Sequence, residues 1–295
     1  YEKLLKQLSL SLNELHSKSY SENYWRIVTG YWLFYYLSVN FDRWENINSS
    51  LNEFKEINFY QAININNQPV AKNTREFMNL ATDVKWNHLT YTKIINFLIK
   101  KKNLNISILE KNYKNESFYY NYKPNIKHNI KMFLVKLYVY FFKKKIKRNK
   151  IILFKTYLGL INENKINLKL KQFPTFFLNK NSKKKINIKL RDSLKLYFNP
   201  KNLFEEFIIQ DIFKSMPSEF LENYETIEEY IQKNELPDDP SLIISTRALA
   251  TDNIFVRYIA KKKEKGCKLI YAQHGGAYGH IKFSWAEDHE IKISD

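Results

Sequence analysis

Cysteine is almost absent from this sequence of 295 residues, which contains only Cys267. One cysteine excludes an internal disulfide and a zinc site built from several cysteines, and it is typical of a protein in a reducing compartment. Long apolar runs are missing as well. The best candidate, Met132 to Phe142, is interrupted by Lys136 and is shorter than the roughly 20 residues of a membrane-spanning helix. We therefore expect a cytoplasmic protein.

Glycine is scarce, with six residues in the chain, yet three of them lie in the loop 273–280, namely Gly275, Gly276 and Gly279. This loop follows the largely apolar run 268–272, which contains a predicted strand. Glycines in this position let backbone N–H groups approach a charged ligand, so we expect these three amides to hold an anion. The spacing is not the dinucleotide fingerprint, and no Gly-Lys-Ser/Thr follows it. The sequence therefore predicts neither NAD nor a P-loop nucleotide, and we expect no cofactor.

Positive charge is abundant, since 48 Lys and Arg face 30 Asp and Glu, a formal net charge of +18. Such an excess fits a solvated lysine surface, an anionic membrane surface or nucleic acid. The lysines alternate with isoleucine and asparagine, as in the segment 183–189, which favours the solvated surface. We do not expect a nucleic-acid partner.

The first half of the chain reads as helical. Apolar residues recur at helical spacing over 4–44, with a break at 17–21, and again over 74–100, where Asn73 or Thr74 is a candidate N-cap. The segments 46–69 and 101–124 show no clear pattern. The stretch 126–150 predicts a basic amphipathic helix, whose apolar side faces either a core or an anionic membrane.

The second half changes to alternating strands and helices. Strands are predicted at 151–154, 242–245 and 269–272, with helices over 203–233 and 252–265. This alternation implies a parallel sheet with right-handed crossovers. We predict an α/β protein with a helical region at 1–150 and a Rossmann-like sheet at 151–295.

Ligands of parallel sheets bind beyond the carboxyl ends of the strands. His274 follows a predicted strand there, so we expect it to act as a general base or as a donor to a phosphate or sugar oxygen, unless it only caps a turn. Arg247, which follows another predicted strand, adds positive charge, and Gln273 and Tyr278 share the glycine loop. Glu290 is a second candidate catalytic residue, unless it is only a surface carboxylate.

Two further groups invite a functional interpretation. Arg26 lies among the aromatic residues Tyr24, Trp25 and Tyr31, where it either binds a phosphate or carboxylate or stacks in a structural corner. The acidic and histidine residues of 287–290 match no metal-binding spacing, so we expect no metal site.

Three separated segment groups together resemble the transferases encoded in bacterial O-antigen and surface-carbohydrate loci. They are 12–16 with 24–33, 204–207 with 216–222, and 245–255 with 265–276 and the trailing 289–295. The resemblance implies a longer enzyme with the two Rossmann-like lobes of a GT-B glycosyltransferase. This chain is then the N-terminal, acceptor-side lobe, and the lobe that binds the donor nucleotide is missing.

These features lead to one main functional hypothesis and two competitors. We expect a transferase that moves a sugar or related group from a nucleotide-activated donor to a glycan or lipid-linked acceptor, with peripheral contact to the anionic inner membrane. The alternatives are a non-catalytic, basic membrane- or glycan-binding module and a nucleic-acid-binding protein. From the residues at its two ends we also expect the chain to be a piece of a longer protein. We expect this piece to be inactive alone.

Overall fold

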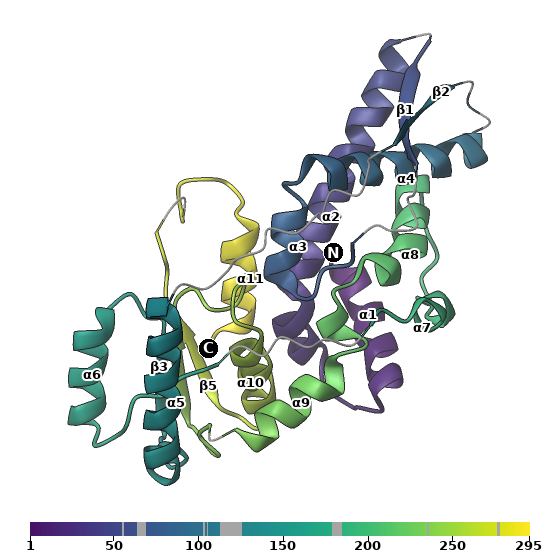
Figure 1. Ribbon diagram of the computed structural model, residues 1–295. Coiled ribbons are helices and arrows are strands. Elements are labelled where there is room, and N and C mark those ends of the chain that lie inside the picture. Colours follow the sequence, from purple (N-terminus) through teal and green to yellow (C-terminus); the bar gives the residue numbers. More distant parts are fainter. Residues whose placement is uncertain are drawn as a thin grey trace. The chain divides into compact units, whose positions relative to one another are not determined.

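A computed structural model describes residues 1–54, 56–63, 69–102, 104, 106–112, 126–178, 185–234, 236–275 and 278–295 (Figure 1). The fold is mixed α/β with small parallel sheets, and 60% of the described residues are helical, which confirms the predicted fold class. The chain forms two compact units. Unit 1 comprises Tyr1–Leu12, Trp32–Tyr120 and Lys184–Glu222, and unit 2 comprises Asn13–Tyr31, Asn121–Lys183 and Asn223–Asp295. Each unit thus takes segments from both sides of residue 150, and the sequential division at that residue stays a prediction.

Unit 1 is largely helical. Its elements are the start of α1 (Glu2–His16), α2 (Glu22–Glu53) from Trp32 onward, β1 (Asn58–Ile63), α3 (Thr74–Leu80), α4 (Val84–Lys102), β2 (Ser107–Asn112), α7 (Ile188–Ser193), α8 (Leu203–Ser215) and the 3-10 turn η2 (Ser218–Phe220). The predicted break at 17–21 and the cap at Asn73, whose side chain accepts from the Glu76 amide, are confirmed. Trp32 and Trp44 lie at the centres of two buried aromatic clusters.

The two segments that showed no clear pattern contain a parallel strand pair. β1 and β2 pair in register from Asn58 with Ser107 to Ile63 with Asn112, and α2 continues to Glu53. The lack of a clear pattern in these segments therefore did not mean a lack of regular structure. Tyr60, Ile108 and Leu109 are exposed, so the apolar residues of these strands are not confined to a buried face. The period-two pattern that marks a half-buried strand is missing for this reason.

Unit 2 contains the predicted sheet. The strands β3 (Ile151–Phe154), β4 (Leu242–Ser245) and β5 (Lys268–Tyr271) are parallel and follow the order β3-β4-β5. Ile152, Ile243 and Leu269 form one register row and are fully buried, which explains why the strands read as short apolar runs. The helices of the unit are the start of α2, α5 (Ile126–Ile146), α6 (Gly159–Lys169), α9 (Tyr224–Lys233), α10 (Asn253–Lys263) and α11 (Trp285–Ile293).

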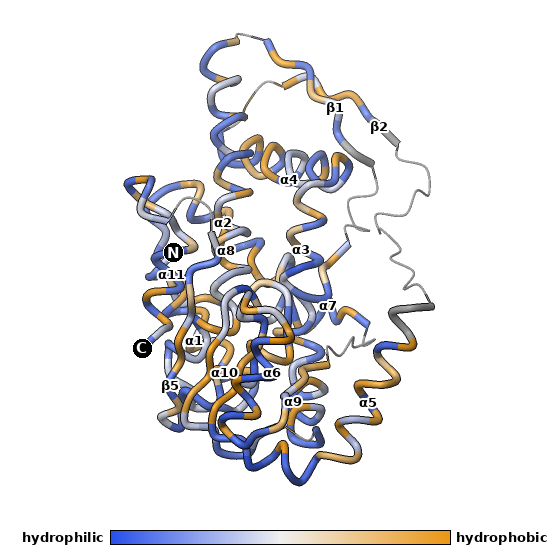
Figure 2. The backbone as a smooth tube through the Cα atoms, turned by 90° about the vertical axis from the view of Figure 1, so that its left-hand side faces the viewer, coloured by the Kyte–Doolittle hydropathy of each residue, from blue (hydrophilic) through white to orange (hydrophobic). Residues whose placement is uncertain are grey.

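Helix α5 presents an apolar stripe to solvent. Tyr138 and Phe142 pack against Phe176 and Phe173 at ring distances of 5.4 and 4.9 Å. Exposed apolar residues occupy helical spacing along α5: Ile130, Phe133, Leu134, Leu137, Tyr140 and Phe141. Orange segments mark the apolar residues of this helix in Figure 2. The expectation of a stripe that faces a core therefore holds only for the face with Tyr138 and Phe142.

Within the described ranges, the structure has no helix that combines the length and the apolar character needed to cross a bilayer.

Candidate functional site

The candidate site lies at the carboxyl edge of the β3-β4-β5 sheet. The strands are parallel and in register, and they end at Phe154, Ser245 and Tyr271. The crevice beyond such an edge is where parallel sheets bind ligands. We refer to the polar residues on and beside the loops that follow β4 and β5 as the carboxyl-edge site: Tyr31, Ser245, Thr246, Arg247, His274, Tyr278 and Glu290.

Glu290 is the centre of a buried hydrogen-bond group in this site. The residue is 4% exposed, and its carboxylate accepts hydrogen bonds from Tyr31 at 2.7 Å, Tyr278 at 2.5 Å and His274 Nε2 at 3.0 Å. Helix α11 presents it, and the Ser284 side chain caps that helix by accepting from the Glu287 amide. Three donors compensate a carboxylate that would be costly to bury alone.

The contact with Glu290 orients the imidazole of His274. A carboxylate only accepts, so Nε2 carries the proton, and Nδ1 of the neutral ring is the remaining acceptor. The His274 side chain is 30% exposed, so part of the ring faces solvent while Glu290 stays buried. A histidine held by a buried carboxylate can take a proton at its other nitrogen, and the carboxylate then stabilises the imidazolium. The predicted residues His274, Tyr278 and Glu290 are therefore brought together.

The tyrosines of the group remain protonated donors at neutral pH. Burial, followed by the nearby Tyr271 and Glu290, raises the pKa of Tyr31 far above its ordinary value. Burial and the hydrogen bond to Glu290 raise the pKa of Tyr278 in the same direction. Both phenols thus hold their protons toward Glu290, and the proton acceptor of this group is the histidine.

The end of β4 contributes polar groups of another kind. The Ser245 and Thr246 side chains are buried, and their hydroxyl oxygens have no hydrogen-bond partner among the described residues. Arg247 follows them, is exposed, and stacks on the Tyr157 ring at 4.9 Å. Tyr157 has a φ of 61°, in the left-handed region that a bulky residue rarely adopts. The loop after β3 therefore holds this ring beneath a guanidinium that an anion can reach.

The glycine loop has the backbone conformation that its sequence favours, and its role in anion binding stays a prediction. Gly275 and Gly279 have φ values of 88° and 71°, which favour glycine, and Gln273 is exposed at the start of the loop. The Gly279 amide donates to the Glu287 carboxylate at 3.4 Å, so an anion would have to displace that contact. Gly276 lies outside the described residues.

Arg26 has a different environment. It lies on α2 and forms an ion pair with Glu22 at 2.9 Å, one turn earlier on the same helix. This contact favours a structural role. No cluster of three or more His, Cys, Asp or Glu suitable for a metal ion occurs in the part of the chain that the structure describes.

Sequence reasoning assigned no site role of their own to Tyr31, Tyr157 and the hydroxyls of Ser245 and Thr246. Tyr31 is 259 positions from Glu290 in the sequence, so only the fold brings them together. Its place in an aromatic segment was visible, but that segment pointed to Arg26. The Ser245-Thr246 pair at the end of an apolar strand was the one local signal for the hydroxyls.

Comparison with known proteins adds a family to this geometry. A family model described as "LIC12162 family transferase" matches residues 1–295, the whole chain. Comparisons with curated proteins and with solved structures found no match.

Proposed function

Since the chain belongs to the LIC12162 family of transferases, we propose that it transfers a glycosyl or related group from a nucleotide-activated donor to a glycan or lipid-linked acceptor in surface-polysaccharide synthesis. The observation that carries the proposal is the hydrogen bond between His274 Nε2 and the buried Glu290 at the carboxyl edge. A base held in this way suits an acceptor hydroxyl, which is a weak nucleophile until its proton is removed.

In the proposed reaction, His274 Nδ1 takes the proton of the acceptor hydroxyl. The acceptor oxygen forms a bond to the transferred carbon, and the bond from that carbon to the donor phosphate oxygen breaks with its electron pair. The leaving nucleoside phosphate gains negative charge, which the exposed Arg247 is suited to stabilise. Glu290 acts through His274 as a positioning residue.

We propose further that the chain is part of a larger enzyme of GT-B type, encoded in an O-antigen or related locus. In that arrangement, this chain is the N-terminal, acceptor-side lobe, and a second lobe binds most of the donor nucleotide. The parallel sheet with its polar carboxyl edge supports a Rossmann-like lobe. On this proposal the chain alone is inactive, no metal or other cofactor takes part, and the donor is the only nucleotide ligand.

The first experiment screens donors with the full-length protein. Nucleotide sugars, CDP-alcohols and their nucleotide products are tested by thermal shift, because a ligand that binds only the native state raises the melting temperature. We expect stabilisation by one nucleotide class and then transfer from that donor. A panel in which no nucleotide shifts the melting temperature or supports transfer would contradict the proposal.

A variant series then tests the base. His274→Ala should lower kcat by about 100-fold or more, in the range of general-base catalysis. His280→Ala is the matched control, because His280 is an exposed histidine in the same loop. Glu290→Gln should lower kcat while leaving KM nearly unchanged. Equal turnover by His274→Ala and the control would remove His274 from the chemistry.

A membrane-binding function is the second candidate, and the exposed stripe of α5 favours it. Apolar and aromatic side chains along one face, followed by Lys143, Lys144 and Lys145, suit a helix that lies on an anionic surface. The same contact would give a lipid-linked acceptor access at the inner membrane face. Sedimentation with phosphatidylglycerol vesicles, and its loss in Phe133→Ser/Phe141→Ser, tests this contact. Binding without donor-dependent transfer would favour a non-catalytic module.

A further inference from the structure

Unit 1 contains a cavity of about 760 Å³ that the proposed reaction does not use. Residues from α3, α4, α7 and α8 line it, together with the segment 69–71 and Ile186. All of these residues belong to unit 1. Ligand pockets for small molecules have volumes of about 300–1,000 Å³, so the cavity has room for one.

Helices α4 and α8 contribute most of the polar lining, each from a single face. The contributions have the same helical spacing on both helices: Lys93, Asn96, Phe97 and Lys100 from α4, and Phe207, Gln210, Asp211 and Lys214 from α8. Positions separated by three and four residues lie on one side of a helix. Each helix therefore presents an aromatic ring flanked by polar and basic groups.

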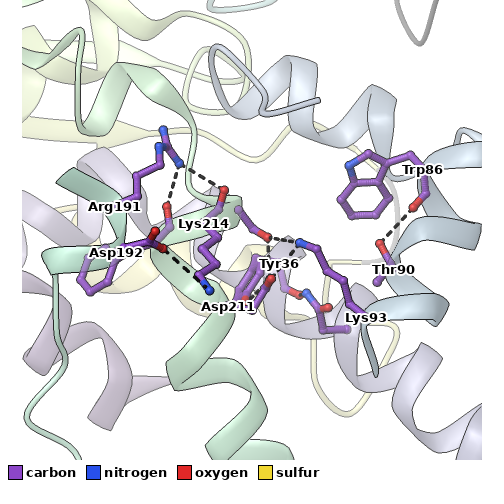
Figure 3. A network of polar contacts seen from close by, with 11 residues as sticks. Tyr36, Trp86, Thr90, Lys93, Arg191, Asp192, Asp211 and Lys214 are labelled. Carbon is purple, nitrogen blue, oxygen red and sulfur yellow. Dashed lines mark hydrogen bonds and ion pairs between the residues drawn. The ribbon is translucent and has the colours of Figure 1, made fainter. Parts of the chain in front are cut away.

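Part of the remaining wall is apolar. Phe77, Leu80 and Trp86 line the cavity, and all three are buried, as are Phe97 and Phe207. Trp86 is shown beside the polar network in Figure 3. Such a surface suits a flat or ring-shaped apolar group, because aromatic side chains offer large contact areas at fixed orientation.

A rigid network holds the polar side of the cavity. Asp211 is buried and accepts from Lys93 at 2.8 Å, Tyr36 at 3.1 Å and Ser215 at 2.5 Å (Figure 3). Asp211 therefore has its negative charge compensated and does not oppose an anionic ligand at full strength. The Lys93 side chain is 20% exposed, and its ammonium has a third donor beyond the contacts to Asp211 and Ser215.

The guanidinium of Arg191 is bonded to other groups of the protein. It forms a bidentate pair with Glu222 and donates to the carbonyls of Phe213 and Met216 at 2.7 Å each, at the end of α8. Its charge lines the cavity, but its donors are occupied, so it supports the wall.

Two lysines at the cavity are available to a ligand. Lys100 is exposed and has no hydrogen bond or ion pair among the contacts of the described residues. Lys214 is 57% exposed, and its ion pair with Asp192 is long, at 3.8 Å. The charge of Arg191 is paired with Glu222, so with Lys93 three lysines face two acidic residues in the lining, Asp192 and Asp211. The electrostatic potential therefore favours a negative group.

We propose that this cavity is a second ligand site, which binds an organic anion: a phosphate or carboxylate group attached to an apolar, ring-sized body. The anionic group lies against Lys100 and Lys214, within reach of Lys93, and the apolar body lies on Phe97, Phe207 and Trp86. The inference does not rest on the proposed transfer reaction, because no residue of the carboxyl-edge site lines the cavity.

The test uses 1-naphthyl phosphate and 1-naphthylacetate, with 1-naphthol and inorganic phosphate as probes that each lack one half of the ligand. Binding to the full chain is measured by calorimetry. We expect one of the two naphthyl anions to bind at least tenfold more tightly than 1-naphthol and than phosphate. The phosphate and carboxylate arms distinguish the two anion chemistries. Equal binding of 1-naphthol, or no binding of either anion, would overturn the proposal.

Variants locate the site. Lys100→Gln should weaken binding by about fivefold, the effect of one partly exposed ion pair, and Lys100→Gln/Lys214→Gln by about tenfold or more. Lys102→Gln is the matched control, because Lys102 is an exposed lysine at the same end of α4 and does not line the cavity. Asn96→Trp should abolish binding by filling the cavity without removing charge. If Lys102→Gln weakens binding as much as Lys100→Gln, or Asn96→Trp binds normally, the ligand does not occupy this cavity.

Discussion

Asp211→Asn tests the buried network of unit 1 with a change of one charge and almost no change of volume. The carboxylate accepts hydrogen bonds from Lys93, Tyr36 and Ser215, all of which belong to the same unit. An asparagine offers one acceptor oxygen and adds two donors, so it cannot accept all three bonds. The substitution also leaves the Lys93 ammonium without its counter-charge.

The structure sets the expected magnitude. Removing one partner of a buried ion pair costs about 3–5 kcal/mol, because the other charge is left uncompensated. The Lys93 side chain is 20% exposed and can regain part of its hydration, which places this site at the low end of that range. We therefore expect Asp211→Asn to lower the free energy of unfolding by about 3 kcal/mol.

Urea unfolding followed by tryptophan fluorescence measures this loss, since Trp32, Trp44 and Trp86 all lie in unit 1. Asp192→Asn is the control. Asp192 is 54% exposed and pairs with Lys214 at 3.8 Å, so its loss should cost less than about 0.5 kcal/mol.

A double-mutant cycle shows whether the pair itself is responsible. Lys93→Met should cost less in the Asp211→Asn background than in the wild type, with a coupling of about 2 kcal/mol. A cost for Asp211→Asn below about 1 kcal/mol, or no coupling with Lys93, would refute the reasoning that this pair is desolvated.

Three further predictions follow from the same structure. Burial raises the pKa of Asp211, but the Lys93 charge and three hydrogen bonds outweigh burial and hold this pKa below its ordinary value. Near that pKa the unfolded chain therefore binds more protons than the folded one. The free energy of unfolding should then fall as pH drops below about 4. Unfolding measured at pH 3 and pH 6 checks this, and the slope should be shallower in Asp211→Asn. Arg191→Lys should lower the free energy of unfolding by about 3 kcal/mol, because lysine cannot pair with Glu222 in bidentate form and also donate to the carbonyls at the end of α8. Thermal melting should show a lower transition temperature. Tyr31→Phe removes one donor from Glu290 and should lower the free energy of unfolding by about 1 kcal/mol, whereas unchanged stability would show that water replaces the phenol.

Most of the sheet and the helices could be predicted from local pattern. The strands at 151–154 and 242–245 match their predicted bounds, and the third begins one residue earlier than expected. Their apolar runs reflect burial on both faces, which is visible without knowledge of the partner strand. The helix expected over 74–100 is two helices, α3 and α4, because Asp83 ends one turn and its side chain accepts from the Trp86 amide at the start of the next.

The parallel pair β1-β2 could not be predicted in this way. Its strands lie far apart in the sequence, and exposed apolar side chains such as Tyr60 and Leu109 remove the usual alternation. Their stability depends on hydrogen bonds to a partner that no local window contains.

By itself, the sequence determined the α/β class and the place of the glycine loop at a strand end, because periodicity and residue type are local properties. The transferase assignment came from the resemblance of three segment groups to a family, which the family model supports. Only the tertiary structure decided which polar groups meet. Glu290 accepts hydrogen bonds from Tyr31 on α2 and from His274 in the loop after β5, and Asp211 accepts one from Lys93 on α4. The sequence pattern of α5 is the same for a helix whose apolar stripe is covered and for one whose stripe is exposed. Only the fold shows that this stripe is exposed. The physical reason is that hydrogen bonds and burial depend on distance in space, which chain folding sets independently of separation in sequence.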